Sequence, residues 1–413
     1  MSSLFFIKVL LILIGLIVVE VYFFKKLAKS VHFLFPGVSQ KRIAFWKSAA
    51  AIFINLLPVF AIIALAYVLI SGTKNFTPPQ SIIFDYLIQY PFWIGAIIIA
   101  QVILIFLIFK LLLVAVRLFI KEKVKLEKTE SAIFIGLLLI FIIYVPARII
   151  YDYNSVEVRK VVYQKENLPD VLEGFKIVLI SDTQADRYTD QKRLKNFIKK
   201  VNYIKPDLVL IGGDIITGSP DYIKIGANYL GKIKTRFGAF SCVGDHDNWA
   251  YRSDMKRSLH EVEQAMLNAG VPMIDDENRT VKVDSAKIKV SFVKNTYVDK
   301  APNGILDTLA YDSTKYDLKI FLVHQPRQRL IDFAVKHNYD LYLCGHTHGG
   351  QMTFLFPFYN ISPTQIETPY MRGNFKFGNL LMIVTRGLGM SVAPVRYNST
   401  PEITVITLKR GVD

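Results

Sequence analysis

Four long apolar runs in the first 150 residues constrain the fold of this chain more than any other feature of its sequence. A helix needs about 20 mostly apolar residues to cross a bilayer, and each run reaches or approaches that length. The runs are Leu4–Phe24, Ala49–Ile70, Phe92–Leu118 and Ala132–Ile150. The first run is too long for a removed signal peptide and lacks a small-residue cleavage site. We therefore expect a membrane region with four transmembrane helices over residues 1–150 and a second domain over residues 151–413.

Composition and charge favour a membrane protein over a nucleic-acid binder. Hydrophobic residues make up 52% of the 413 residues, and the mean hydropathy is +0.32. The formal net charge is +16, but residues 1–150 hold 15 Lys and Arg against five acidic residues, so most of the excess lies in the apolar third of the chain. Basic residues beside membrane spans explain this distribution. The lipid bilayer is therefore an expected partner, and nucleic acid is not.

Basic residues between the apolar runs predict the orientation of the chain. They are concentrated in the first and third loops, as Lys25, Lys26, Lys29, Lys41, Arg42 and Lys47, then Lys121, Lys123, Lys125 and Lys128. The second loop has only Lys74. Because cytoplasmic loops are enriched in Lys and Arg, we expect both termini and residues 151–413 on the outer, extracytoplasmic face. If one run were a helix lying on the membrane surface, the second domain would face the cytoplasm.

Beyond about residue 156, short apolar runs alternate with mixed stretches of helical period. Five runs are predicted to be strands: Lys176–Ile180, Leu208–Ile211, Ala239–Val243, Ile320–Val323 and Leu341–Cys344. The stretches Asp190–Ile204 and Ser253–Ala269 are predicted to be helices. This alternation is typical of a layered α/β domain, which displays its chemistry at the ends of its strands.

Aspartate and histidine residues follow these predicted strands in series. They are Asp182, Asp214, Asp245, His246, Asp247, His324, His346 and His348, and they include four of the seven histidines. Any one of them alone has an ordinary structural explanation, such as a helix N-cap. Together, carboxylates and imidazoles suit a divalent metal such as Mn, Fe or Zn, and one shared carboxylate can hold two ions. The two cysteines cannot form a disulfide framework or a CxxC zinc site.

This series of motifs resembles that of the calcineurin-like metallophosphoesterases, in particular their membrane-anchored YkuE/YaeI-like branch. The family pattern is D-x-H, G-D, G-N-H-D/E, a lone H, and G-H-x-H. The chain reads Asp182-Thr183-Gln184, Gly213-Asp214, Gly244-Asp245-His246-Asp247, His324 and Gly345-His346-Thr347-His348. The resemblance covers about residues 160–410 and does not extend to the apolar region. It implies an α/β fold in which a β-sandwich is flanked by helices in an α/β/β/α order.

The resemblance also implies a binuclear metal centre. The first ion would be held by Asp182, Gln184 and His348, the second by Asp245, His324 and His346, and Asp214 would bridge the two. His246 would not bind metal. It would stabilise the transition state or protonate the leaving oxygen, with Asp247 orienting it.

Two positions depart from the family pattern. Gln184 stands where the family usually has His, and an amide oxygen coordinates more weakly than imidazole. Asp245 stands where the family usually has Asn, and its charge favours harder ions such as Mn or Mg. We expect two divalent ions in an oxygen-rich centre that selects Mn over Zn, with Fe, Zn and Mg as further alternatives. Partial loss of function is the competing interpretation.

The expected reaction is hydrolysis of a phosphodiester, phosphomonoester or pyrophosphate bond by metal-activated water. Membrane spans and an outward-facing site favour an envelope or lipid-linked substrate. The aromatic residues in the segment Phe354–Tyr359 would form a lip against lipid, or simply pack. Two alternatives remain open: a tethered general phosphodiesterase for soluble nucleotides or small phosphoesters, and a membrane sensor or scaffold with a vestigial metal site. The sequence does not indicate the oligomeric state.

Overall fold

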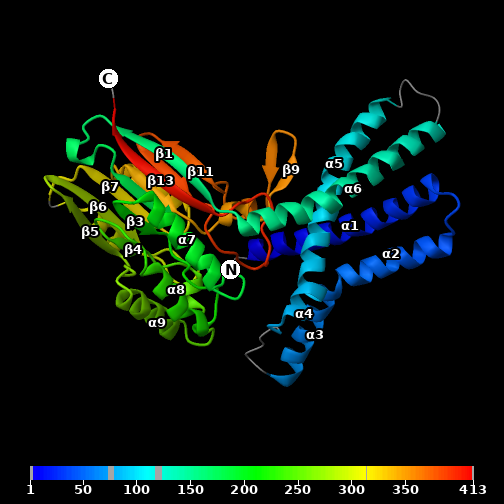
Figure 1. Ribbon diagram of the computed structural model, residues 1–413, viewed down its shortest axis with the longest axis horizontal. Helices are drawn as coiled ribbons and strands as arrows, with labels where there is room; N and C mark the ends of the chain where they lie inside the picture. Colours follow the sequence, from blue (N-terminus) through cyan, green and yellow to red (C-terminus); the bar gives the residue numbers. More distant parts are fainter. Residues whose placement is uncertain (1–2, 73–78, 117–122, 313, 412–413) are drawn as a thin grey trace. The chain divides into compact units, whose positions relative to one another are not determined.

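The computed structural model describes residues 3–72, 79–116, 123–312 and 314–411, and contacts divide the chain into two units (Figure 1). The helical unit comprises Met1–Ile150 together with Met352–Ile361. The sandwich unit comprises Tyr151–Gln351 and Ser362–Asp413. The sequence did not anticipate that residues 352–361, which directly follow a metal-ligand motif, would belong with the helices.

The helical unit contains long apolar helices. Its helices are α1 (Ser3–Leu34), α2 (Gln40–Ile54), α3 (Leu56–Ser71), α4 (Ile82–Phe84), α5 (Tyr90–Val116) and α6 (Lys123–Asn154), the last of which ends in the sandwich unit. Two helical stretches, Ile82–Val114 and Val124–Asn154, are long and apolar enough to cross a membrane. The pair α2 and α3, bent by 50°, would count as a third. The predicted run Ala49–Ile70 is therefore broken at Asn55, between α2 and α3.

Parts of the predicted membrane region lie outside the described residues. The run Leu4–Phe24 falls in α1, of which the side chains of residues 3–13 are not described. The end of the run Phe92–Leu118 is outside as well, and so are Lys74 and Lys121, on which the predicted orientation partly depends. Among the described residues, the structure therefore supports two to three spanning helices.

Polar side chains of the helical unit pair with one another. Lys26 on α1 contacts Glu130 on α6, with 2.7 Å between Nζ and Oε1, and both side chains are about nine-tenths buried. Lys110 Nζ on α5 donates to the hydroxyl of Tyr22 on α1 at 3.0 Å. An unpaired charge among apolar helices is costly, so each of these polar groups needs its partner on the neighbouring helix. Each pair therefore favours one arrangement of its two helices, which apolar packing alone does not specify.

A short hairpin of the helical unit is fixed to α5. Its strands are β9 (Phe354–Phe356) and β10 (Tyr359–Ile361), paired antiparallel. The fully buried side chain of Gln101 on α5 bonds to the backbone of Leu355 twice: Nε2 donates to its carbonyl and Oε1 accepts from its N–H, both at 2.8 Å. Gln101 thus pairs with β9 as a neighbouring strand would. The hairpin exposes Phe358 and Tyr359.

Two β-sheets form the centre of the sandwich unit. The first sheet has the strand order β1-β13-β2-β3-β4, with bounds Glu157–Lys165, Glu402–Arg410, Lys176–Ile180, Leu208–Ile211 and Ala239–Ser241. The second has the order β11-β12-β8-β7-β6-β5, with bounds Gly373–Phe377, Leu380–Val384, Leu341–Cys344, Leu318–Val323, Ala286–Val293 and Glu277–Val283. All five predicted strands therefore form, with small differences at their ends.

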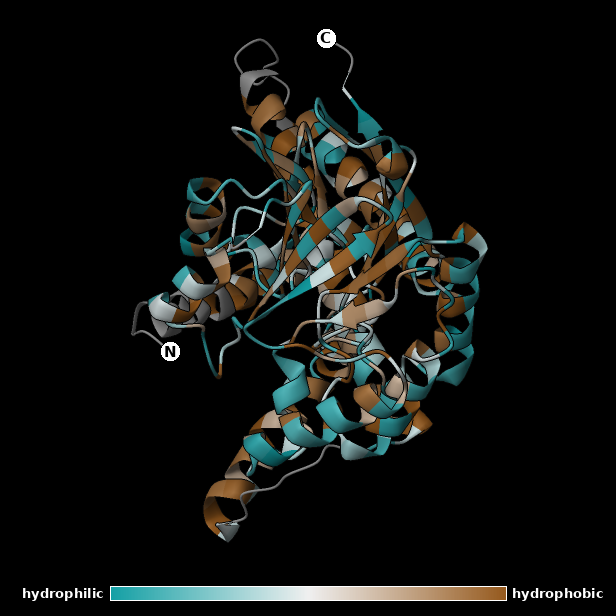
Figure 2. Ribbon diagram, turned by 90° about the vertical axis from the view of Figure 1, so that its left-hand side faces the viewer, coloured by the Kyte–Doolittle hydropathy of each residue, from teal (hydrophilic) through white to brown (hydrophobic). Residues whose placement is uncertain are grey.

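Three apolar clusters hold this unit together in layers. The central cluster lies between the sheets and joins residues such as Leu210 and Leu343. A second cluster packs α7 (Gln191–Ile204), α8 (Ile223–Leu230) and α9 (Met255–Asn268) against the first sheet (Figure 1). A third packs α10 (Asn303–Ala310) and α11 (Gln328–Lys336) against the second sheet. Polar residues among the strands in Figure 2 belong mainly to edge strands such as β1 and β5, whereas the central strands β2, β3 and β8 are buried on both faces, as expected between a second sheet and covering helices. The α/β prediction, with helices outside a sandwich, is confirmed.

The direction of the strands determines where the loops that carry the candidate ligands lie. In the first sheet β2, β3 and β4 run parallel, and in the second β6, β7, β8 and β12 run parallel. Parallel strands end at one edge of their sheet, so the loops that follow them meet there.

Candidate metal centre

Most of the predicted ligands lie in loops at the carboxyl ends of parallel strands. Asp182, Asp214 and Asp245 follow β2, β3 and β4, whereas His324 and His346 follow β7 and β8. All five side chains are at most about one-tenth exposed. Residues spread over more than 160 positions of the chain are therefore brought to one buried site.

The backbone at this site is strained. Twelve described residues other than glycine have a positive φ, and five of them are candidate ligands: Asp182, Gln184, Asp214, His346 and His348, at φ 48–70°. Each such residue costs about 1–3 kcal/mol and persists only where the surrounding structure enforces it. Concentration of this strain at one sheet edge is typical of a functional site.

The motif glycines allow the loops to approach one another closely. A Cβ on Gly244 would lie 2.2 Å from the backbone nitrogen of Asp214, and a Cβ on Gly345 would lie 2.3 Å from Asp182 Oδ2. No side chain fits at either position without moving a candidate ligand. Glycine is therefore required there by the packing of the carboxylates.

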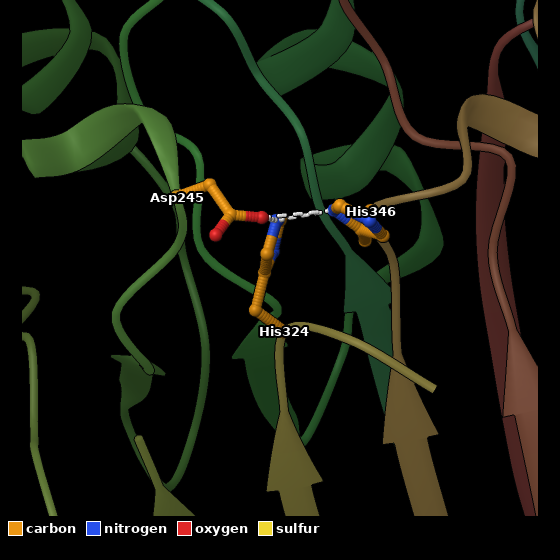
Figure 3. A group of neighbouring side chains, drawn as sticks. All are labelled: Asp245, His324 and His346. Carbon is orange, nitrogen blue, oxygen red and sulfur yellow. Dashed lines mark hydrogen bonds and ion pairs between the residues drawn. The ribbon is translucent and has the colours of Figure 1, made fainter. Parts of the chain in front are cut away.

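Two groups of side chains have the spacing of metal ligands. Figure 3 shows the first, Asp245, His324 and His346, converging from three different loops. His346 Nδ1 lies 2.9 Å from Asp245 Oδ2, and His324 Nε2 lies 3.3 Å from the same oxygen. The second group is Asp182, Asp214 and His324. His324 belongs to both groups, so the two candidate positions adjoin.

The two histidines of Figure 3 each have one ring nitrogen facing the group and the other bonded behind it. His324 Nδ1 lies 2.7 Å from the carbonyl oxygen of Gly212 and must carry the hydrogen, which leaves Nε2 unprotonated when the ring is neutral. His346 Nε2 lies 3.1 Å from Glu367 Oε1, which leaves Nδ1 facing Asp245. Metal-binding histidines are usually backed in this way by a carbonyl or a carboxylate.

The remaining predicted ligands, Gln184 and His348, lie beside the second group. Gln184 Nε2 donates to Asp214 Oδ2 at 2.7 Å, and its buried Oε1 accepts no hydrogen bond among the described residues. His348 Nε2 lies 3.6 Å from Asp182 Oδ1. An unsatisfied buried oxygen beside clustered carboxylates is what a bound cation would correct.

The electrostatics show that these carboxylates need positive charge. Burial raises the pKa of Asp182. Burial also acts to raise the pKa of Asp245, but hydrogen bonds from His324 and His346 outweigh it and hold this pKa well below the usual range. Burial acts to lower the pKa of His346, but hydrogen bonds to the carboxylates of Asp245 and Glu367 outweigh it and raise this pKa to about 9. Imidazoles and carboxylates at this site therefore offset each other's charge.

His348 differs from the other histidines. Burial, together with the guanidinium of Arg396, lowers the pKa of His348 well below its usual value. The fully buried Arg396 lies with Nη2 3.3 Å from His348 Nδ1 and also donates to the carbonyls of Gly389 and Ser399. His348 is therefore kept neutral, the form that can bind a metal.

The predicted catalytic pair is arranged differently from the expectation. His246 Nδ1 bonds to the carbonyl oxygen of Thr217, and its Nε2 lies 3.0 Å from Ser391 Oγ. Asp247 instead accepts the backbone N–H groups of Asp214, Ile215 and Gly244, at 3.0, 2.8 and 2.8 Å. Thr217 therefore orients the imidazole, and the carboxylate of Asp247 organises the loop that carries Asp214.

Besides Thr217, Ser391 and Arg396, four further residues near the site were missed by the sequence reasoning. Gln325, Arg327, Tyr297 and Glu367 form a hydrogen-bonded cluster beside Asp245 and His346. Gln325 directly follows His324 at the end of β7, a position that could have drawn attention to it. Glu367 has no such signal.

The donor set fits two divalent cations. Carboxylates and imidazoles suit ions of intermediate hardness, and Gln184 Oε1 adds an oxygen that no described group satisfies. The two groups adjoin at His324, whose Nε2 can bind one ion only. A bridge between two ions would have to be a carboxylate such as that of Asp214, which lies 3.4 Å from this nitrogen.

Comparison with known proteins agrees with this geometry. Residues 175–350 match the family profile of the calcineurin-like phosphoesterases. The chain is 34% identical over 250 residues to the uncharacterized metallophosphoesterase YkuE of Bacillus subtilis, which covers 59% of this chain and 82% of YkuE. It is 28% identical over 258 residues to a transmembrane protein with metallophosphoesterase domain from Danio rerio (60% of this chain, 56% of the relative). It is 24% identical over 237 residues to the phosphodiesterase YaeI of Escherichia coli (57% and 82%). The chain therefore belongs to the calcineurin-like metallophosphoesterases and is a metal-dependent phosphoester hydrolase.

Proposed function

We propose that this chain is a membrane-bound two-metal phosphoesterase that acts on an envelope or lipid-linked phosphoester. One observation carries the substrate class. The metal-ligand loop that contains His346 and His348 continues at residue 352 into the β9–β10 hairpin, which belongs to the helical unit and is fixed to α5 by Gln101. A metal-ligand loop that runs directly into a hairpin held by an apolar helix links the site, along the chain, to the region that we propose lies in the membrane, and this supports a lipid-linked substrate.

The proposed metal ligands combine the two groups of side chains with the family pattern. We assign the second ion to Asp245, His324 and His346, which form one group. Following the family pattern, we assign the first ion to Asp182, Gln184 and His348, with Asp214 as the bridge. When bound, two such cations bind phosphoryl oxygens, activate water and orient it in line with the leaving group.

The chain's own residues supply the remaining chemistry. The Thr217 carbonyl fixes His246 Nδ1 as the protonated nitrogen, so Nε2 is free to hold a further proton and deliver it to the leaving oxygen. Ser391, 3.0 Å away, marks where Nε2 points. Asp247 holds the Asp214 loop against the backbone of Gly244, which keeps the proposed bridge in place.

We propose four membrane spans, namely α1, the bent pair α2–α3, the stretch Ile82–Val114 and Val124–Asn154, with the sandwich unit on the outer face. The basic residues of the first and third loops support this orientation. Both natural cysteines are buried, so a cysteine at the exposed position of Tyr203 can report the side. Labelling of Tyr203→Cys by an impermeant maleimide in intact cells is expected, and labelling only after lysis would contradict the orientation.

Removing the hairpin anchor tests the substrate class. Gln101→Leu leaves the backbone groups of Leu355 without their partner, and a displaced hairpin is expected to lower turnover of a lipid-linked phosphodiester about tenfold or more. Hydrolysis of the soluble diester bis-p-nitrophenyl phosphate should stay near the parent rate. Gln89→Leu is the matched control, because Gln89 bonds locally to Asp85. Parent protein that hydrolyses nucleotides faster than lipid substrates would instead indicate a tethered general phosphodiesterase.

Metal preference tests the two departures from the family pattern. In metal-stripped protein, the parent is expected to turn over bis-p-nitrophenyl phosphate fastest with Mn, because Gln184 and Asp245 make the site rich in oxygen. In the double variant, Gln184→His replaces an amide oxygen by an imidazole nitrogen, and Asp245→Asn removes a negative charge. Its fastest rate is therefore expected with Zn. A parent that works best with Zn would refute the proposed selectivity.

A further inference from the structure

A carboxylate outside every motif of the sequence lies behind one of the candidate metal ligands. Glu367 follows a short turn, Pro363–Ile366, and is 21 residues beyond His346 in the chain. Its Oε1 lies 3.1 Å from His346 Nε2. Its side chain is about three-quarters buried, so this contact is partly shielded from water.

The geometry of His346 gives its two ring nitrogens separate tasks. Nδ1 faces Asp245 Oδ2 at 2.9 Å and His324 Nε2 at 3.3 Å, as Figure 3 shows. Nε2 faces Glu367 instead. A neutral imidazole that offers Nδ1 to a metal must carry its hydrogen on Nε2. Glu367 Oε1, at 3.1 Å, is a nearer acceptor for that hydrogen than the hydroxyl of Tyr297, at 3.4 Å, and it carries the negative charge.

Glu367 is itself held in place by donors that lead back to the same site. Arg327 and the hydroxyl of Tyr297 both donate to its Oε1. Arg327 Nε donates to Gln325 Oε1 at 2.9 Å, and Gln325 Nε2 donates to Asp245 Oδ1 and Oδ2 at 2.9 and 2.7 Å. The contacts therefore close a ring: Asp245, His346, Glu367, Arg327, Gln325 and back to Asp245.

This ring also accounts for an aspartate at position 245. The Gln325 amide binds both carboxylate oxygens, and the backbone N–H of Tyr297 donates to Oδ1 at 2.6 Å. The positive charge of Arg327 lies one residue further along the ring. Donors arranged in this way stabilise the ionised carboxylate of Asp245. Glu367, on the other side of the ring, orients His346, which faces that carboxylate.

We propose that Glu367 is a positioning residue that acts through His346 to set how tightly the second metal ion is held. The inference rests on the proposed two-metal function. Glu367 fixes the ring so that Nδ1 faces Asp245 and His324, and its charge makes that nitrogen a stronger donor. Loss of Glu367 should weaken the second ion and leave the first ion unchanged.

The test is metal titration of full-length, metal-stripped protein in detergent. Binding of Co²⁺ is followed by its visible absorption, and Mn²⁺ binding is followed by calorimetry. Glu367→Gln is nearly isosteric, and we expect it to weaken the second ion about 10- to 100-fold. Glu367→Asp keeps the charge and should recover part of this affinity. The Mn concentration for half-maximal hydrolysis should rise in Glu367→Gln, whereas kcat at saturating Mn should return close to that of the parent.

Glu261→Gln is the matched control. Glu261 on α9 also accepts from an arginine and a tyrosine, Arg257 and Tyr251, each at 2.8 Å, but no candidate ligand contacts it. It should bind both ions as the parent does. Equal affinity of Glu367→Gln and the parent for the second ion would overturn the inference and leave the two-metal function intact. A parent that binds no ion would overturn the function itself, so the two failures are distinguishable.

Discussion

Asp214→Ala is expected to lower hydrolysis of bis-p-nitrophenyl phosphate about 10³-fold or more. Asp214 is 2% exposed, accepts from His246 N and Gln184 Nε2, and lies 3.4 Å from His324 Nε2. A carboxylate shared by two cations contributes to both, and loss of metal charge at the phosphoryl group costs several kcal/mol of transition-state stabilisation. Steady-state rates measured with excess Mn check this expectation.

Two further variants separate chemistry from folding. Alanine disfavours the positive φ of 58° at position 214, whereas Asp214→Asn keeps the shape and tolerates this conformation. Asp214→Asn should therefore fold like the parent and still lose most activity.

Asp207 is also a buried aspartate, but it accepts from Lys176 N and Arg236 Nη1, both at 2.8 Å, away from the ligands. Asp207→Ala should lose about 1–3 kcal/mol of stability and keep its kcat. Full activity in Asp214→Asn would show that the bridge is misassigned.

His246→Gln is expected to lower kcat by about 10²- to 10⁴-fold for substrates with poor leaving groups, because glutamine cannot deliver a proton. The effect should shrink for p-nitrophenyl esters, whose leaving group needs little protonation. Metal content should stay at the parent value, since His246 belongs to neither group of ligand atoms. Rates across a series of leaving groups, with metal analysis of each sample, check both points.

The control for His246 is His260→Gln on the exposed face of α9, which should change neither rate nor metal content. An equal loss in His246→Gln for good and poor leaving groups would argue against proton delivery. It would favour direct stabilisation of the transition state by the imidazole.

The strands and the polar residues that follow them could be predicted because local sequence determines them. The runs Lys176–Ile180, Leu208–Ile211 and Leu341–Cys344 are the strands β2, β3 and β8 without any shift. Asp190 was placed in a helix but lies just outside it, as the N-cap whose carboxylate accepts from Arg193 N. The spacing of apolar residues and the polar residues that follow each strand are enough to locate these strands and this helix in a single sequence.

The parts that were missed depend on contacts between distant segments. Glu367 reaches His346 only because the β9–β10 hairpin between them turns the chain back, and no spacing in the sequence records that return. Gln101 pairs with Leu355 across more than 250 residues. The break at Asn55 differs, because Pro58 marks it in the sequence: proline cannot bond to the carbonyl four residues earlier, which is that of Ile54, the last residue of α2.

Metal stoichiometry and activity measured on one sample test the central claim most directly. The purified full-length protein is stripped of metal, titrated with Mn and assayed with bis-p-nitrophenyl phosphate at each point, beside Asp214→Asn. The account predicts two bound ions per chain in the parent. Hydrolysis should rise as the ions bind and be absent without them. Asp214→Asn should lose both the two-ion binding and the hydrolysis. Hydrolysis that persists in the stripped protein, or a parent that binds no ion and shows no turnover, would contradict it.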